Sequence, residues 1–441
     1  MTQKILFSAL LLVMLLGDVG RMAYAAQPVV LSVDSLFSLI DDRSRTVKLK
    51  ALCVDDAVSG ESVARGNLLP HINASLSVGY LGDGYLTDRD FGNGMVIRNP
   101  HSKNDFALEA MQVIYSGGEL SGSVRMAKLN ADMAQLNLEE SRQQVKFLLL
   151  GWLIDLQCIH NRIRVLDENI GLARSVLDNV RARYDEGVAL KSDVTRYELQ
   201  LEDLKLQREK AGEAMRTTNY RLANALGFPT EDTEFIPALP LMDGTKEIEP
   251  ENSWQEQARS SSLALQKAGL GISMSETSRK IATAALRPKL SLFAYGLFNS
   301  PIVTEVPVIN KNIMFWGFGA SLSFNISSLY TANRRVRQAR IAEMESREAY
   351  SLGAENVEDD VQAAYESYRT AVTELRTQEK SLELARQNYD IVNDRFENGM
   401  ALVTDMVDAA NVRLSSETGV ENARTALLFR YYRLKYATNT L

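Results

Sequence analysis

The stretch VKFLLLGWLIDLQCIHNRIRVLDENIGLARSVLDNVRARY, residues 145–184, decides the fold of this chain. Apolar and aromatic side chains recur in it at alternating steps of four and three. They are Val145, Leu149, Trp152, Leu156, Ile159, Ile163, Leu166, Ile170, Ala173, Leu177, Val180 and Tyr184. An average step of 3.5 residues keeps one apolar seam on one side of a helix and favours a left-handed supercoil with a partner. The sequence therefore predicts a long amphipathic helix that packs along its whole length.

The same pattern occurs again 212 residues further along the chain. The matching positions are Val357, Val361, Ala364, Tyr368, Ala371, Leu375, Gln378, Leu382, Ala385, Tyr389, Val392 and Phe396. All but Gln378 are apolar or aromatic. At the same offset Leu172-Ala-Arg174 matches Leu384-Ala-Arg386, and Tyr220-Arg-Leu222 matches Tyr432-Arg-Leu434. We infer an internal duplication, with one architecture built twice.

The domain organisation follows from this repeat and from the N-terminus. Lys4, the apolar run Ile5–Leu16 and the small-x-small site Ala23-Tyr-Ala25 are typical of a secretory signal peptide. The run is too short to span a membrane. We expect a signal peptide, two structural repeats and a proline-rich linker between the repeats. Their expected bounds are 1–25 for the signal, 26–226 and 252–441 for the repeats, and 227–251 for the linker.

Each repeat is expected to give a helix, two strands, a long helix, a turn and a second helix. The expected helices are Asp34–Leu68, Ser121–Glu186, Ser192–Leu226, Asn252–Leu286, Ala332–Asn398 and one from Thr404 to near the end; a long loop is expected at Gly82–Lys103. Glycines end the long helices at Gly187 and Gly399. At about 1.5 Å per residue each long helix would measure roughly 100 Å, more than a compact domain accommodates.

Period-two alternation predicts four strands, each with an apolar face and a small polar face. They are Ile72–Tyr80, Phe106–Ile114, Leu290–Phe298 and Met314–Phe324. A length of about ten residues suits a tilted strand that crosses an outer membrane, with aromatic girdles at its ends. The girdle candidates are Tyr80, Tyr115, Tyr295, Phe298, Phe315 and Trp316. The strands alone fit an ordinary sandwich almost as well; the signal peptide and the long helices favour the membrane.

Four strands cannot close a barrel, and an open edge in lipid leaves backbone groups unpaired. Barrels in outer membranes have at least about eight strands. The chain is therefore predicted to pool its strands with identical copies in an obligate oligomer. The fold class is mainly α with membrane β: long coiled-coil helical hairpins plus strands given to a shared barrel.

At this point the chain resembles the TolC-like outer-membrane efflux protein family. The resemblance covers the mature chain and rests on Leu69-Pro70 with Arg287-Pro288, on Tyr115-Ser-Gly-Gly118, and on the turns Arg183-Tyr-Asp-Glu-Gly187 and Arg395-Phe-Glu-Asn-Gly399. It implies a homotrimer with a 12-stranded β-barrel in the outer membrane and a helical tunnel in the periplasm. It further implies an exit duct of a tripartite efflux pump or type I secretion system. The implied partners are outer-membrane lipid, a periplasmic adaptor docking at Gly187 and Gly399, and an inner-membrane transporter of the RND, ABC or MFS type.

The resemblance also implies an acidic constriction at the periplasmic end of the tunnel. Asp405 and Asp408 are three residues apart on one helical face, and Asp193 is the first-repeat counterpart of Asp405. Such a ring favours cations and repels anions; helix capping is the simpler interpretation of Asp405. Some members lock this entrance with a basic residue and a tyrosine where this chain has Ala401 and Phe396. We therefore expect a differently latched closed entrance.

Composition and motifs point away from other classes. Net charge is −7 and acids and bases are interspersed, so nucleic acid is not an expected partner. His71, His101 and His160 fall in different elements, and no catalytic, phosphate-binding or metal-ligating constellation is found. We expect no enzyme activity, cofactor or metal.

Three alternatives stay open at this stage. A periplasmic coiled-coil adaptor or scaffold would explain the helices but not the strands. Cys53 and Cys158 are interpreted as two packed helix cysteines, although a disulfide between them is conceivable. Arg334, Arg335, Arg337 and Arg340 follow a strand closely; a solvated helix start is the simpler interpretation, and contact with anionic lipid headgroups is the other.

Overall fold

The computed structural model describes residues 28–231, 233–240 and 248–441, so the expected signal peptide lies outside the described residues. The chain divides into two compact units by its internal contacts. The first contains the chain up to Leu49, Glu139–Leu263 and Glu355–Leu441; the second contains Lys50–Leu138 and Ala264–Ala354. Each unit takes segments from both repeats. The expected domain bounds, which follow the repeats, stay a prediction.

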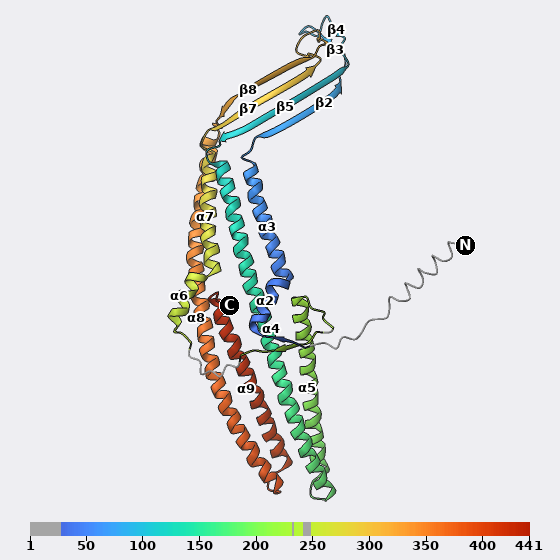
Figure 1. The fold of residues 1–441 in the computed structure, drawn as a ribbon, viewed down its shortest axis with the longest axis vertical. Coiled ribbons are helices and arrows are strands. Elements are labelled where there is room, and N and C mark those ends of the chain that lie inside the picture. Colours follow the sequence, from blue (N-terminus) through green and yellow to red (C-terminus); the bar gives the residue numbers. More distant parts are fainter. Residues whose placement is uncertain (1–27, 232, 241–247) are drawn as a thin grey trace, which may run out of the picture. The chain divides into compact units, whose positions relative to one another are not determined.

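Helices make up most of the described chain (Figure 1). They are α2 (Val33–Arg43), α3 (Arg45–Gly66), α4 (Glu119–Asp185), α5 (Lys191–Leu226), α6 (Glu251–Ser261), α7 (Leu263–Ala284), α8 (Ser328–Glu397) and α9 (Val403–Ala437). The long helices α4 and α8 begin and end within a few residues of the predicted positions. No described helix combines the length and the apolar character needed to cross a bilayer.

The predicted seams are buried where the helices of the first unit pack together. Of the seam positions on α4 and α8, only Tyr184 is exposed. One cluster joins α4 residues such as Leu177 to Tyr197 on α5 and Met406 on α9. The polar position Gln378 lies against Gly419, where an added Cβ would be 2.7 Å from the Gln378 Oε1 atom. The 3.5-residue spacing therefore did predict the packed face.

The two predicted single helices Asp34–Leu68 and Asn252–Leu286 are each broken in the structure. The break lies at Ser44 between α2 and α3 and at Ser262 between α6 and α7, and both serines have extended ψ values of 122° and 116°. The serines are equivalent positions of the two repeats, and both are buried. No glycine or proline marks either break, so periodicity alone passed over it.

A four-stranded antiparallel sheet in the second unit takes two strands from each repeat. Its order is β2 (His71–Tyr80), β5 (Ser102–Tyr115), β7 (Lys289–Ser300) and β8 (Ile313–Ser323). The central pair β5–β7 joins the first repeat to the second. The outer edges of β2 and β8 have no partner strand among the described residues. The open edges agree with strands that are completed by other copies.

The strand register places the predicted apolar faces on one side of the sheet. Ala74 pairs with Leu108, Leu108 with Gly296, and Gly296 with Trp316. Large side chains on this side are strongly exposed in one protomer; Trp316 is 74% and Phe318 78% exposed. An exposed apolar surface of this kind requires lipid or another chain to cover it.

The opposite side corrects the aromatic girdle expected from the sequence. Tyr295 pairs with Glu109 and Gly317, so it lies in the middle of β7 on the polar side. Phe315 is on the same polar side. The Tyr295 ring stacks on Phe293, and a Cβ on Gly317 would be 2.8 Å from the Tyr295 hydroxyl. The ring covers a glycine across the strand, a role that an alternation pattern does not reveal.

The structure contains short strands that the alternation pattern does not predict. The expected loop Gly82–Lys103 contains the hairpin of β3 (Gly84–Leu86) and β4 (Met95–Ile97). In the first unit β1 (Val29–Leu31) pairs in parallel with β6 (Phe235–Pro237). Three-residue strands are too short for a periodic signal.

Candidate functional site

The two turns that end the long helices have the same construction. Gly187 and Gly399 adopt the left-handed conformation, with φ of 77° and 70°. After each glycine the chain bonds back to the helix, from Val188 N to Arg183 O at 2.8 Å and from Met400 N to Arg395 O at 2.7 Å. A glycine is favoured here because a side chain strains this conformation.

Aspartates begin the helices that follow these turns. Asp193 Oδ2 accepts a hydrogen bond from Leu190 N at 3.1 Å, and Asp405 Oδ2 accepts one from Leu402 N at 3.0 Å. Both carboxylates thus complete the first turn of a helix, where the helix dipole favours negative charge. Asp405 therefore caps helix α9, as its simpler interpretation expected, and Asp193 caps α5 in the same way.

Asp408 differs from Asp405, although both carboxylates are exposed. Asp408 has no hydrogen-bond or ion-pair partner among the residues that the structure describes. It lies one helical turn after Asp405 on α9. Its charge is therefore available to the solvent beside the second turn.

Phe396 and Arg183 join the two turns. The Phe396 side chain is 4% exposed, within the seam, and the guanidinium of Arg183 lies over its ring at 4.6 Å. Arg183 also donates to the carbonyl oxygens of Phe396 and Glu397, both at 2.9 Å. We expect Phe396 to support Arg183 rather than to face an aperture. Ala401 packs on the same apolar cluster.

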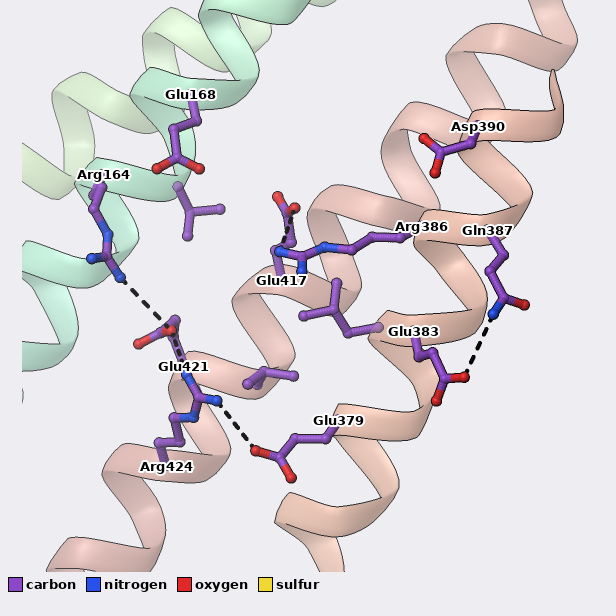
Figure 2. A pocket seen from close by; sticks show the side chains of 13 residues that line it. Arg164, Glu168, Glu379, Glu383, Arg386, Gln387, Asp390, Glu417, Glu421 and Arg424 are labelled. Carbon is purple, nitrogen blue, oxygen red and sulfur yellow. Dashed lines mark hydrogen bonds and ion pairs between the residues drawn. The ribbon is translucent and has the colours of Figure 1, made fainter. Parts of the chain in front are cut away.

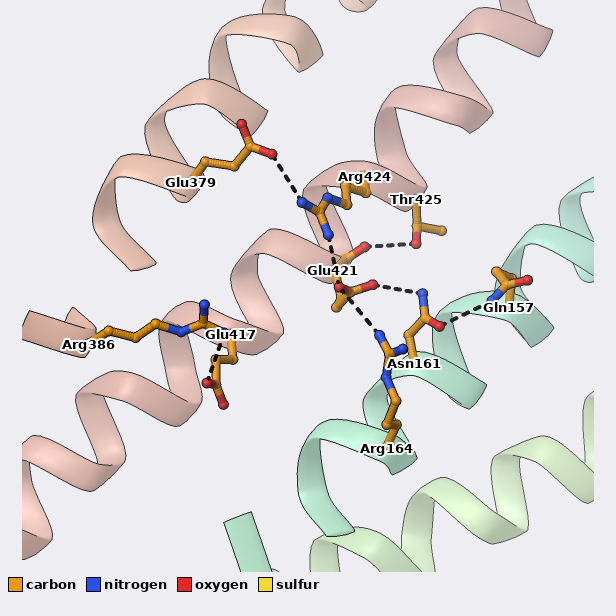
Figure 3. Close-up of polar contacts among 9 residues, drawn as sticks. All are labelled: Gln157, Asn161, Arg164, Glu379, Arg386, Glu417, Glu421, Arg424 and Thr425. Atoms are coloured by element: carbon orange, nitrogen blue, oxygen red, sulfur yellow. Dashed lines mark hydrogen bonds and ion pairs between the residues drawn. The ribbon is translucent and has the colours of Figure 1, made fainter. Parts of the chain in front are cut away.

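Further along the helices, a buried carboxylate joins the repeats. Glu417 on α9 is 5% exposed. It accepts hydrogen bonds from Asn169 of α4 at 2.9 Å and from Arg413 at 3.1 Å. It also accepts one from Arg386 of α8 at 3.4 Å (Figure 3). A buried charge is tolerated when it is paired and hydrogen-bonded in this way.

A second carboxylate lies one turn beyond it. Glu421 accepts from Asn161 at 2.7 Å and from Arg424 at 3.3 Å, with Arg164 4.0 Å away. Arg424 continues the network to Glu379 of α8 at 3.2 Å (Figure 3). Helix α4 of the first repeat is therefore held against α8 and α9 of the second repeat by charge-assisted hydrogen bonds.

These groups surround a cavity of about 620 Å³ between α4 and the α8–α9 pair (Figure 2). Its charged lining residues are Glu168, Glu379, Glu383, Asp390, Glu417 and Glu421 with Arg164, Arg386 and Arg424. Acids exceed bases, so the cavity carries negative charge. The sequence patterns did not predict this cavity. Glu417 is an acid among the buried, otherwise apolar residues of α9, and the first repeat has Lys205 at its position.

The histidines and cysteines do not gather. His101 stacks on Tyr80 at 5.0 Å, and no cluster of three potential metal ligands is found in the described part of the chain. Cys53 and Cys158 are free; Cys53 is exposed in one protomer, so the expected packing does not hold for it. Burial raises the pKa of the Cys158 thiol, which makes it a poor nucleophile.

Comparisons with known proteins give the family. A profile described as "Outer membrane efflux protein" matches residues 36–228 and 254–440, one segment in each repeat. A search of curated proteins finds no match. Because the profile covers most of the chain, this protein belongs to the outer membrane efflux protein family.

Solved structures show the same fold at low sequence identity. The CmeC outer membrane channel of Campylobacter jejuni is 15% identical with a TM-score of 0.77, over 92% of this chain and 85% of that one. VceC of Vibrio cholerae is 12% identical with a TM-score of 0.74, over 92% and 95% of the two chains. The outer-membrane channel OprN is 15% identical with a TM-score of 0.76, over 93% and 90%.

The family membership shows where in the cell the four-stranded sheet and the long helices are located. The protein is an outer-membrane exit channel of efflux pumps, with its strands in the outer membrane and its helical tunnel in the periplasm. Channels of this family are trimers, so the open edges of β2 and β8 are completed by other protomers. The scaffold alternative left these strands without a role.

Proposed function

We propose that the trimer conducts cargo passively and docks through its helix turns onto a periplasmic adaptor. The adaptor in turn links it to an inner-membrane transporter of the RND, ABC or MFS type. Gly187 and Gly399 shape the docking turns, and Asp405, Asp408 and Asp193 surround the aperture beside them. Among these aspartates, Asp408 carries the unpaired charge.

One observation carries the docking proposal: each turn exposes two apolar side chains, and they occupy equivalent positions in the two repeats. Val188 is 75% and Leu190 69% exposed in the first turn, and Met400 is 72% and Leu402 69% exposed in the second. The pairs are equivalent positions of the two repeats. The link through Arg183 holds the two turns side by side.

The leucines are unfavourable for the helices that they precede. Leu190 and Leu402 are the N-cap residues of α5 and α9, and neither side chain makes a capping hydrogen bond. Serine, threonine, aspartate or asparagine at an N-cap stabilises a helix by about 1 kcal/mol relative to an apolar residue. An exposed leucine at both caps therefore supports contact with a partner rather than stability of this chain.

The double variant Leu190→Ser/Leu402→Ser separates these two effects. We expect the thermal stability of the trimer to stay the same or rise, because serine caps both helices. We expect the affinity for the cognate adaptor to fall at least about tenfold, because burying a leucine contributes about 2 kcal/mol. Calorimetry of the trimer measures the stability, and titration with the cognate periplasmic adaptor measures the affinity.

Leu172→Ser/Leu384→Ser is the matched control. These leucines are also equivalent in the two repeats and are exposed on α4 and α8 away from the turns. Serine lowers helix propensity there, so stability falls while adaptor binding stays unchanged. Adaptor binding that survives the change at Leu190 and Leu402 would contradict docking at the turns.

A further inference from the structure

Basic residues are concentrated in three of the four segments that join a helix to a long strand; in the fourth, at the end of α3, Arg65 is paired with Glu61 at 2.7 Å. Segments 117–130, 276–289 and 328–341 contain these bases: Arg125, Lys128, Arg279, Lys280, Arg287, Lys289, Arg334, Arg335, Arg337 and Arg340. Their acids are Glu119 and Glu276. The whole chain has a net charge of −7, so this local excess of positive charge opposes the general composition.

Some of these bases are already neutralised within the second unit. Lys289 pairs with Glu119 at 2.5 Å, and Arg279 pairs with Glu343 at 2.5 Å. Eight of these ten bases have no acidic partner among the described residues, and five of the eight lie nearest to the strands in the sequence. These five, which we name the basic collar, are Arg125, Lys280, Arg287, Arg334 and Arg335.

The collar gathers because its three helices pack side by side. Gly122 of α4 faces Ile281 of α7 so closely that an added Cβ would be 2.6 Å from the isoleucine. Helix α7 contacts α8 through the hydroxyls of Ser275 and Ser346 at 2.6 Å. The absence of a side chain at Gly122 thus brings the bases of α4 and α7 together.

A cavity of about 600 Å³ lies between α4 and α7 among three of these bases. Arg125, Lys280 and Arg287 line it, together with the hydroxyl residues Ser121 and Thr283. Both hydroxyls donate to backbone carbonyls, Ser121 to Gly118 O at 3.2 Å and Thr283 to Arg279 O at 2.8 Å. The guanidinium and ammonium groups are therefore the donors that match the acceptor oxygens of a phosphate group.

The local backbone fixes Arg287 at the edge of this cavity. Its Nη1 atom donates to Gly117 O at 3.0 Å. Gly117 has φ of 67°, and an added Cβ would be 2.8 Å from both Ala284 O and Arg287 Cβ. Only glycine fits this position, and the remaining guanidinium nitrogens of Arg287 stay available for a ligand.

With the strands in the outer membrane, we expect the collar at the depth of lipid headgroups. Arg125 is six residues into α4 and Arg334 six residues into α8, which is about 9 Å along each helix. The headgroup layer adds roughly 5–8 Å on each side of the hydrocarbon core. With the strands in the membrane, these bases therefore reach the phosphates of the periplasmic leaflet.

We propose that the basic collar binds the headgroup phosphates of anionic phospholipids in the periplasmic leaflet of the outer membrane. Clustered lysines and arginines beside a membrane segment are attracted to an anionic surface, and the attraction weakens with salt. The binding anchors the junction between strands and helices to the bilayer. It involves neither the helix turns nor an adaptor.

The test uses the purified trimer in neutral detergent, titrated with phosphatidylglycerol, phosphatidylcholine or inorganic phosphate. We expect phosphatidylglycerol to raise the thermal unfolding temperature and the other two to have little effect. The quadruple variant Arg125→Gln/Lys280→Gln/Arg334→Gln/Arg335→Gln should bind phosphatidylglycerol at least about tenfold more weakly. Arg287 is left unchanged because its bond to Gly117 supports the fold.

Arg174→Gln/Arg376→Gln is the control, since it removes exposed bases from the same helices, α4 and α8, in the first unit. It should respond to phosphatidylglycerol like the wild type. Equal responses of the two variants, or of the two lipids, would overturn the proposal. So would a full response to inorganic phosphate, which would assign the cavity to the free ion. A lipid-free loss of trimer stability confined to the quadruple variant would assign the bases to a neighbouring protomer instead.

Discussion

Trimers carrying Arg183→Gln are expected to conduct several-fold more current than wild-type trimers in planar bilayers. The change removes two charge-assisted hydrogen bonds, to Phe396 O and Glu397 O at 2.9 Å, and the contact over the Phe396 ring. For a partly exposed group we expect the lost contacts to shift the balance between open and closed forms by about 1 kcal/mol for the whole trimer, which is a several-fold change. Each 1.4 kcal/mol changes the ratio of open to closed forms about tenfold.

Arg181→Gln is the control for the loss of charge. Arg181 lies two residues earlier on α4 and pairs with Glu198 on α5 at 2.7 Å, within one hairpin and not across the two turns. Its conductance should therefore equal that of the wild type. Arg183→Lys keeps the charge but not the two-point geometry, and we expect an intermediate conductance. Equal conductances of the Arg183→Gln and Arg181→Gln channels would show that Arg183 does not hold the entrance closed.

Asp408→Asn is expected to reduce the preference of the channel for cations over anions by about tenfold. In the proposed aperture, three protomers would contribute three of these carboxylates. At ~8 Å each carboxylate attracts a cation and repels an anion by roughly 0.5 kcal/mol in a water-like dielectric before screening. Physiological salt, with a Debye length of about 8 Å, reduces this to about a third, so the three together change the cation-to-anion ratio by about a factor of ten. Reversal potentials in a salt gradient measure the change, and low salt enlarges it because screening is weaker.

Asp405→Asn separates the aperture from the helix cap. Asp405 bonds to Leu402 N at 3.0 Å, so its loss should lower the stability of α9 by about 0.5–1 kcal/mol. Its effect on ion selectivity should be smaller than that of Asp408, whose charge is unpaired. A larger selectivity change for Asp405→Asn than for Asp408→Asn would mean that the wrong aspartate has been assigned to the ring.

The order of the long helices and strands could be predicted from the sequence, because burial of one face requires apolar residues at a regular spacing. The seam positions on α4 and α8 had to be apolar to pack, and strand alternation had to separate a wet from an apolar side. The duplication then confirmed each pattern against its own copy. The helix breaks at Ser44 and Ser262 have no glycine or proline and do not change the apolar period. Only the presence of a serine at the same position of both repeats could have indicated them.

The site was less predictable because its contacts depend on geometry rather than on residue type. Arg183 donates hydrogen bonds to backbone carbonyls of residues more than two hundred positions away. Every residue has such a carbonyl, so the sequence does not show which one is used. Tyr295 was placed at a strand end, yet it covers Gly317 in mid-strand on the polar side. Glu417 is an acid among the buried, otherwise apolar residues of α9, which a count of apolar positions alone overlooked.

One chain supplies four long strands to the sheet, so its barrel has to be shared with identical copies. The most direct test is the mass of the protein extracted from outer membranes, measured in detergent by light scattering. We predict a particle of three chains that needs detergent to stay in solution and that separates into monomers only on heating. A folded monomer that remains soluble without detergent would contradict the shared barrel.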